Sequence, residues 1–251
     1  MTTVDVVVPV YNEEQALPRT IPTLRAFLSQ PTFPYSWRIV IADNASTDGT
    51  PQVGQRLSAD SGDDVEYVRI EAKGRGRALK QTWLASPMEI VSYMDVDLST
   101  GLDAFPALIG AIAQDGYDVA IGSRLASGSR VDRSLKRRVL TRGYNLLIKA
   151  AFFTRFSDAQ CGFKAVSQQA VQRVLPLIED NNWFFDTELL ILAEKLGYRV
   201  KDVPVSWMED LDTRVKIGST IAEDLRGLVR LRLRRPWLAG AEPDARKGQA
   251  P

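Results

Sequence analysis

Short apolar runs alternate with segments of helical spacing through the first half of the chain. Most of these runs are apolar on both faces, a pattern typical of strands buried in a parallel sheet. Strands are predicted over residues 4–10, 39–42, 65–70, 90–94 and 118–123. Apolar residues spaced three or four apart predict helices over residues 13–28, 51–57 and 105–113. This alternation indicates an α/β domain with a mostly parallel sheet.

The second half contains longer helical segments that carry many arginines. Two basic amphipathic helices are predicted over residues 135–156 and 217–235. A short strand is predicted over residues 162–167 and an apolar helix over residues 185–196. No linker rich in Pro, Gly or Ser separates the halves, so we expect a single domain over residues 1–235. Residues 236–251 lack apolar periodicity and are predicted to form a disordered tail.

The composition excludes several reaction classes. The 251 residues include no histidine and a single cysteine, Cys161. Catalytic triads that use histidine, histidine zinc sites and disulfides within the chain are therefore excluded. Any metal must be held by oxygen ligands, which favours Mg²⁺ or Mn²⁺ bound by Asp or Glu.

The net charge of +1 hides a separation of charge along the chain. Residues 124–155 carry nine bases and one acid, and residues 226–235 carry five arginines and no acid. Such segments bind phosphates or an anionic membrane surface, or they form solvated helix faces, and the charges alone leave both interpretations open. No apolar stretch reaches the ~18 residues that span a bilayer, and the N-terminus lacks the basic start of a secretory signal.

Two carboxylates follow the apolar run 90–94. Asp95 and Asp97 stand at the carboxyl end of this predicted strand, the edge at which open α/β sheets bind ligands. Two carboxylates within reach of one Mg²⁺ or Mn²⁺ can hold it against a diphosphate and neutralise the charge of a leaving group. A second Asp-x-Asp triplet, at residues 210–212, has no strand before it, so position favours the first.

Polar residues also follow the first two predicted strands. Asp43 ends the second strand, where an acid can accept hydrogen bonds from a nucleobase or from ribose hydroxyls. Asp48 and Thr50 by themselves indicate a turn and a helix cap. The sequence Lys-Gly-Arg-Gly-Arg at residues 73–77 combines positive charge with close backbone approach, which suits a diphosphate, and on its own it indicates a basic turn.

Seven segments in order carry a resemblance to a known family: V-P-V-Y-N-E-E, D-N-A-S-T-D-G-T, K-G-R-G-R-A, D-V-D, G-S-R, D-A-Q-C-G-F-K and W-F-F-D-T-E-L-L. Over residues 4–208 the chain resembles the inverting GT-A glycosyltransferases. It is most similar to the dolichyl-phosphate or polyprenyl-phosphate β-glucosyltransferases and the related dolichyl-phosphate mannose synthases. The resemblance implies a Rossmann-like GT-A fold with a nucleotide-binding part over about residues 1–124 and an acceptor-binding part over about residues 125–235.

The resemblance also implies a set of site residues. The nucleotide sugar would contact Pro9, Tyr11, Glu13, Asp43, Lys73, Asp95 and Arg124. Asp95 and Asp97 would hold Mg²⁺ or Mn²⁺. The catalytic residues would be Asp97, Asp158 and Arg138, with Arg138 meeting a phosphate and Asp158 standing near the acceptor, where it would orient Arg138 or Lys164.

The sequence departs from the family pattern in two places. The glycine-lysine-glycine stretch of relatives appears here as Lys73-Gly74-Arg75-Gly76. The membrane-spanning helices that follow the catalytic domain in many relatives are not found in the sequence.

The implied reaction suits a chain without histidine. The phosphate of a polyprenyl or dolichyl phosphate would attack the anomeric carbon of a nucleotide sugar, with UDP-glucose favoured over GDP-mannose, and the nucleoside diphosphate would leave with inversion. A phosphate monoester needs no base, because its second pKa is ~6 and it is largely dianionic at neutral pH.

Two alternative functions stay open. The first is a GT-A transferase that acts on a hydroxyl acceptor, with Asp158 as the base. The second is a nucleotide-binding module without catalysis. For the favoured function we expect a peripheral location on the cytoplasmic face of an anionic membrane, and no nucleic-acid partner.

Overall fold

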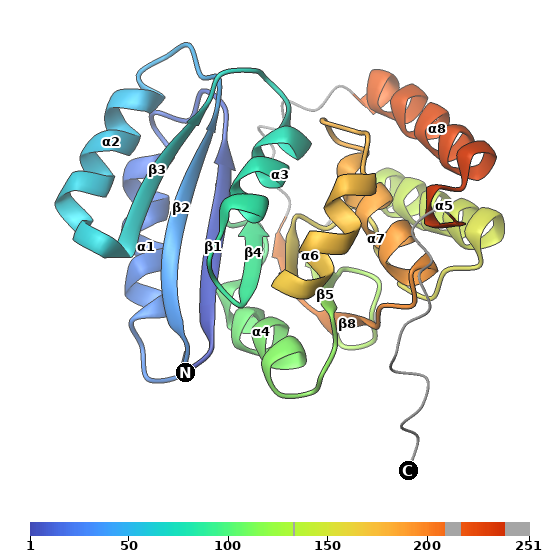
Figure 1. The fold of residues 1–251 in the computed structure, drawn as a ribbon, viewed down its shortest axis with the longest axis horizontal. Coiled ribbons are helices and arrows are strands. Elements are labelled where there is room, and N and C mark those ends of the chain that lie inside the picture. Colours follow the sequence, from blue (N-terminus) through green and yellow to red (C-terminus); the bar gives the residue numbers. More distant parts are fainter. Residues whose placement is uncertain (133, 209–216, 239–251) are drawn as a thin grey trace.

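The computed structural model describes residues 1–132, 134–208 and 217–238 of the chain. Figure 1 shows a central sheet with helices on both faces. The sheet has seven strands in the order β3-β2-β1-β4-β7-β5-β8. The strands are β1 (Thr3–Val10), β2 (Ser36–Asn44), β3 (Val65–Ile70), β4 (Ile90–Met94), β5 (Val119–Ser123), β7 (Phe163–Ser167) and β8 (Val200–Pro204).

The strands run parallel to one another except for β7. This strand pairs antiparallel with both β4 and β5, while the other strand pairs of the sheet are parallel. A second, two-stranded sheet pairs β6 (Arg130–Asp132) with β9 (Ser206–Met208). The prediction of a mostly parallel α/β sheet is therefore confirmed.

Eight α-helices surround the sheet in the described part of the chain. They are α1 (Leu17–Leu28), α2 (Thr50–Ser61), α3 (Arg75–Ala85), α4 (Phe105–Ala113), α5 (Leu135–Phe152), α6 (Gln168–Val174), α7 (Phe185–Lys195) and α8 (Ile217–Arg234). Apolar residues of α1 and α4 form one core cluster with the sheet, and those of α3, α5, α6, α7 and α8 form another. In Figure 1, α5 and α8 lie outside α7, away from β1–β3.

The chain order of the strands has a switch point at β1 and β4. The chain moves outward from β1 through β2 to β3, and then returns to place β4 on the other side of β1. The loops that follow β1 and β4 consequently leave in opposite directions, and open α/β sheets bind ligands at such a point. The residues that follow these two strands include Tyr11 and Asp95.

Several boundaries differ from the prediction. Helix α1 begins at Leu17, because the chain first turns between Glu13 and Ala16. Helix α5 ends at Phe152, since Phe153 takes a left-handed conformation with φ 56°. The predicted basic turn at 73–77 is wrong in part, because α3 begins at Arg75.

The predicted tail also begins later than expected. Residues Pro236–Leu238 form a 3-10 turn, and the Trp237 ring packs edge-on against Phe152 with 6.2 Å between ring centroids. The remaining tail residues, 239–251, lie outside the described residues, as do the acids of the 210–212 triplet.

Candidate active site

The carboxyl ends of β1, β2 and β4 meet at one edge of the sheet. Val10 pairs with Asp43 across β1 and β2, and Val7 pairs with Tyr93 across β1 and β4. Each of these strands is followed by a non-glycine residue in the left-handed region, namely Asn12 (φ 57°), Ala45 (φ 59°) and Leu98 (φ 50°). Such conformations are costly and concentrate at functional sites, so this edge is the first candidate for a ligand site.

Residues of the loop after β1 lie at this edge of the sheet. The Lys73 Nζ lies 3.7 Å from the centroid of the Tyr11 ring. Pro9, Tyr11 and Glu13 are half-buried, and Lys73 is exposed. The Glu13 amide donates to Thr50 Oγ1 over 2.7 Å, which holds the loop on α2. These four predicted residues therefore lie around one edge of the sheet, within reach of a common ligand.

Asp43 lies at the predicted strand end, but its carboxylate already has three donors. The Ser46 amide donates to Oδ1 over 2.9 Å, and the Tyr67 hydroxyl and Arg69 Nη1 donate to Oδ2 over 2.6 and 3.0 Å. Burial and the hydrogen bond to Asp43 raise the pKa of Tyr67 to about 12. Asp43 is fully buried, so in this structure it joins the loop after β2 to Tyr67 and Arg69 of β3.

Asp95 and Asp97 follow β4, and their side chains are exposed to solvent to different degrees. The Asp95 side chain is 45% exposed, and Asp97 is exposed with its Oδ1 accepting from the Ser99 amide over 2.9 Å. Gly162 leaves space for Asp95, because a Cβ at Gly162 would lie 1.8 Å from Asp95 Oδ2. The sequence Cys-Gly-Phe therefore needs glycine at this position.

The donor set at this edge fits a hard divalent cation. Both residues offer carboxylate oxygens, the ligand type that Mg²⁺ and Mn²⁺ prefer. Within the described ranges no cluster of three or more Asp, Glu or Cys side chains could hold a metal by itself. A cation held by Asp95 and Asp97 would take its further ligands from a substrate diphosphate or water.

Arg75 is the residue of this edge that sequence reasoning missed. Its Nη2 lies 2.7 Å from Asp95 Oδ1, and its Nη1 lies 2.5 Å from Asp186 Oδ2. Asp186 also pairs with the Lys164 Nζ over 2.8 Å. The one sequence signal at Arg75 is its departure from the Gly-Lys-Gly pattern of relatives. This signal does not reveal that Arg75 pairs with Asp95 and Asp186.

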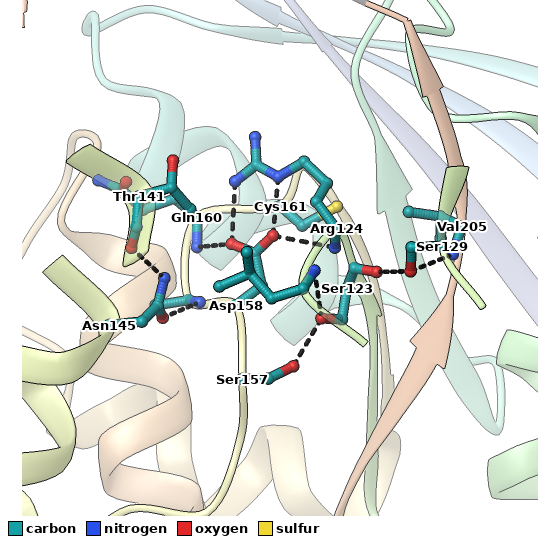
Figure 2. A network of polar contacts seen from close by, with 12 residues as sticks. Ser123, Arg124, Ser129, Thr141, Asn145, Ser157, Asp158, Gln160, Cys161 and Val205 are labelled. Atoms are coloured by element: carbon teal, nitrogen blue, oxygen red, sulfur yellow. Dashed lines mark hydrogen bonds and ion pairs between the residues drawn. The ribbon is translucent and has the colours of Figure 1, made fainter. Parts of the chain in front are cut away.

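Arg124 follows β5, Asp158 precedes β7, and the two form a buried ion pair, shown in Figure 2. The Arg124 Nε and Nη2 donate to the two carboxylate oxygens over 2.7 and 2.9 Å, and the Arg124 amide donates to Oδ2 over 3.1 Å. The Gln160 amide also donates to Asp158 Oδ1 over 3.3 Å. Asp158 is fully buried, and the Arg124 side chain is 8% exposed.

The pairing of Asp158 differs from the expectation. Its partner is Arg124, whereas Lys164 pairs with Asp186. Burial acts to raise the pKa of Asp158, but the charge and hydrogen bonds of Arg124 outweigh burial and hold this pKa below its ordinary value. Arg138 lies exposed near the start of α5, and the structure does not bring it to Asp158.

Helices α5 and α8 each present apolar residues to solvent. On α8, Ile221, Leu225, Val229 and Leu233 are 44 to 78% exposed, while Leu228 and Leu231 pack inside. On α5 and just after it, the large apolar residues that are more than 60% exposed are Leu135, Val139, Leu146 and Phe153. We call these eight residues the α5–α8 apolar surface. None of the helices in the described part of the chain is both long enough and apolar enough to cross a membrane.

Comparison with known proteins identifies relatives over most of the chain. Residues 5–175 match the model of the family described as Glycosyl transferase family 2. The chain is 34% identical over 244 residues to "Glycosyltransferase AglD" of Haloferax volcanii, which covers 96% of this chain and 38% of that protein. It is 32% identical over 222 residues to the "Dolichyl-phosphate beta-glucosyltransferase" of Drosophila melanogaster, covering 81% of this chain and 66% of the relative.

Solved structures share the fold at low identity. The "mannosyl-3-phosphoglycerate synthase from Rubrobacter xylanophilus" has a TM-score of 0.70 and 17% identity, and the match covers 100% of this chain and 79% of that one. The "glucosyl-3-phosphoglycerate synthase from Mycobacterium tuberculosis in complex with Mn2+ and uridine-diphosphate-glucose" has a TM-score of 0.63 and 17% identity, covering 92% and 79%.

Proposed function

The chain belongs to glycosyl transferase family 2, and on this premise we propose that it moves a hexose from a nucleotide sugar to a polyprenyl or dolichyl phosphate with inversion. UDP-glucose is the favoured donor and GDP-mannose the second. Several relatives are named dolichyl-phosphate beta-glucosyltransferase, which supports this choice. The match spans only 38% of AglD, so activity and partners are proposed for this chain and not transferred from that relative.

The observation that carries the proposal is the buried pair of Arg124 and Asp158. A general base must be free to take a proton and works best with a pKa near the working pH. Asp158 has both oxygens bound by Arg124, and its pKa is lowered. A carboxylate in this state is a poor base for a hydroxyl acceptor, whereas a phosphate acceptor arrives ionised and needs no base.

The Arg124 guanidinium keeps one nitrogen for a ligand. Asp158 takes up Nε and Nη2, and Nη1 has no protein partner among the described residues. In our proposal Asp158 fixes Arg124, and the donor hydrogens of Nη1 bind a phosphate oxygen. Arginine suits this task because its planar fork can bind a carboxylate on one side and a phosphate on another.

The other predicted residues take roles that agree with their positions. Pro9, Tyr11 and Glu13 would surround the nucleoside, the buried Asp43 would hold the loop beside it through the Ser46 amide, and Lys73 would approach the diphosphate. Asp95 and Asp97 would hold Mg²⁺ or Mn²⁺, which when bound would neutralise the charge that develops on the departing diphosphate. Structural neighbours crystallised with Mn²⁺ and a nucleotide sugar support the cation.

The proposal includes peripheral contact with an anionic membrane on the cytoplasmic face, where the lipid acceptor would be met. The α5–α8 apolar surface supports it, because solvent-facing apolar residues lie beside arginines on the same helices. Arg138 is exposed near the start of α5, so we assign it to the phosphate of the acceptor or of a neighbouring lipid.

The test compares two acceptors that differ only in the phosphate. Purified protein with Mn²⁺ receives UDP-glucose or GDP-mannose together with either a polyprenyl phosphate or the polyprenol of the same chain length. We expect transfer to the phosphate and none to the alcohol. The rate should rise as pH increases through about 6, because the acceptor loses its second proton there. Transfer to the alcohol would instead support the hydroxyl-acceptor alternative, and nucleotide binding without transfer would support the non-catalytic module.

A further inference from the structure

Arg75 lies between the predicted cation ligands and α7, and the function proposed above gives it no role. It is the first residue of α3, and its side chain is 11% exposed. The guanidinium carbon lies 4.8 Å from the centroid of the Tyr93 ring and 5.0 Å from that of Trp183. Aromatic rings at these distances attract a cation, so the guanidinium is held in one place.

The two ends of the guanidinium bind different carboxylates. Nη2 pairs with Asp95 Oδ1 over 2.7 Å, and Nη1 pairs with Asp186 Oδ2 over 2.5 Å. Asp95 follows β4, whereas Asp186 lies in the first turn of α7. The rigid fork of arginine can satisfy both acids in fixed directions, which the single ammonium of lysine cannot do.

Asp186 is itself fixed from its other side. The Tyr93 hydroxyl donates to Asp186 Oδ1, and the Lys164 Nζ pairs with the same oxygen over 2.8 Å. Lys164 is fully buried and also donates to the Cys161 carbonyl over 2.6 Å. Burial acts to raise the pKa of Asp186, but the charges of Lys164 and Arg75 outweigh burial and lower it. Asp186 is therefore held in its ionised form by Arg75, Tyr93 and Lys164.

Two glycines, Gly74 and Gly76, let the backbone at the start of α3 approach the start of α7 closely. A Cβ at Gly74 would lie 2.5 Å from the Asn181 carbonyl oxygen, and a Cβ at Gly76 would lie 2.6 Å from the Phe185 Cβ. The Arg77 amide donates to the same Asn181 carbonyl over 3.0 Å. The backbone of α3 is thus pressed onto the segment that leads into α7, and this contact sets the position of Arg75.

We propose that Arg75 is a positioning residue for the cation site, which ties the Asp95 carboxylate to Asp186 and thereby fixes the orientation in which Asp95 can meet the cation. The inference rests on the proposed function, in which Asp95 is a cation ligand. Residues that orient metal ligands typically change metal affinity 10–100-fold when they are replaced. Through Asp186, the same contact joins the cation site to α7 and to Lys164.

The test measures cation affinity directly. The purified full chain is titrated with Mn²⁺ alone, with Mn²⁺ and UDP, and with Mn²⁺ and GDP, and free Mn²⁺ is followed by electron paramagnetic resonance. We expect Arg75→Lys to weaken Mn²⁺ binding roughly 10–100-fold. Arg77→Lys is the matched control two residues along the same helix, and it should change the affinity less than about twofold. Unfolding midpoints of both variants show whether the fold is retained.

A pair of further variants separates the possible explanations. If Arg75 acts through Asp186, then Asp186→Asn weakens Mn²⁺ binding as well, and adding Arg75→Lys to it weakens binding little further. The proposal is overturned if Arg75→Lys behaves like Arg77→Lys or if it tightens Mn²⁺ binding. Asp95→Asn that binds Mn²⁺ as tightly as the unaltered chain would show that the proposed cation site itself is wrong.

Discussion

The two halves of the chain use their charged residues in opposite ways. In residues 1–124, three of the predicted cation and phosphate ligands are open to solvent at the sheet edge: Lys73 and Asp97 are exposed, and Asp95 is 45% exposed, whereas Arg124 is buried. In the described part of residues 125–235, five charged side chains are almost fully buried, and four of them are in ion pairs. The five, each at most 4% exposed, are Asp158, Lys164, Asp186, Glu188 and Asp224.

This difference separates residues that can meet a ligand from residues that hold other residues. Burying a charge is costly unless it is paired, so buried acids such as Asp158 and Asp186 are bound by arginine or lysine. Exposed carboxylates such as Asp97 keep oxygens that a cation can reach. Asp5 and Asp43 are the exceptions among the acids of the first half, since both are buried and paired, Asp5 with Arg38 and Asp43 with Arg69.

The strongest test of this comparison removes one partner of the buried pair. Asp158→Ala leaves the Arg124 charge buried without its partner, and we expect it to lower the free energy of unfolding by about 3–5 kcal/mol. Denaturant unfolding followed by circular dichroism measures the loss. The double variant Arg124→Met/Asp158→Ala should recover a large part of the stability, because it removes both charges. A loss of less than about 1 kcal/mol for the single variant would contradict a holding role for Asp158.

The opposite result is expected for Asp97, an exposed acid in residues 1–124. Asp97→Asn keeps an oxygen for the Ser99 amide but removes a charge that would bind the cation, so transferase activity should fall roughly 10²–10³-fold. Its free energy of unfolding should change by only about 0.5 kcal/mol, because the side chain is exposed. Removing divalent cations with a chelator should abolish activity, and adding Mn²⁺ should restore it.

Asp103→Asn is the matched control for that experiment. Asp103 is another exposed acid, six positions further along the chain, and it has no part in the candidate site. It should retain activity. Equal losses for the two variants would show that the effect of Asp97 comes from general surface charge and not from cation binding.

The elements with continuous apolar patterns could be predicted closely from the sequence. The strand over 90–94 and the helix over 105–113 have the predicted bounds, because their buried positions follow one another or repeat at helical spacing. The strand over 65–70 also has the predicted bounds, although only its two end residues are buried. The start of α3 at Arg75 was missed, since its two glycines indicate a turn until the contact with Asn181 is known.

The pairing of charges could not be predicted in the same way. Arg75 and Asp186 are 111 positions apart, and Arg124 and Asp158 are 34 positions apart. Local patterns contain no information about which distant acid meets which arginine. The resemblance identified Arg124 and Asp158 as site residues, but their mutual contact depends on how the loop after β5 packs against the segment before β7.

The α5–α8 apolar surface allows a test of the proposed membrane contact. Leu225→Ser and Val229→Ser each remove apolar area that is about half exposed to solvent, so each should weaken binding to anionic vesicles roughly tenfold. Cosedimentation at low salt measures this binding. Leu84→Ser on α3 is the control, because Leu84 is similarly exposed and lies outside this surface. If all three variants bind the vesicles equally well, the exposed apolar residues of α8 do not contribute to membrane binding.

The smallest effect concerns Asp224, a buried acid of α8 without a cationic partner among the described residues. The Gln160 Nε2 donates to Asp224 Oδ2 over 2.9 Å. Burial raises the pKa of Asp224 from its ordinary value of 3.8 to about 7; the hydrogen bond with Tyr144 lowers it, and the charges of Asp180, Glu223 and Asp186 raise it further.

Because this pKa is higher in the folded chain, Asp224 favours folding fully below about pH 4, and that contribution is lost as pH rises through about 7. Asp224→Asn stays neutral and keeps an acceptor for Gln160. The unfolding midpoint of the unaltered chain, measured relative to this variant, should therefore fall between pH 4 and pH 7 and level off above that range. A difference that is the same at every pH from 4 to 8 would mean that Asp224 is ionised in the folded protein, and the second half would then contain a buried acid that needs no counter-charge.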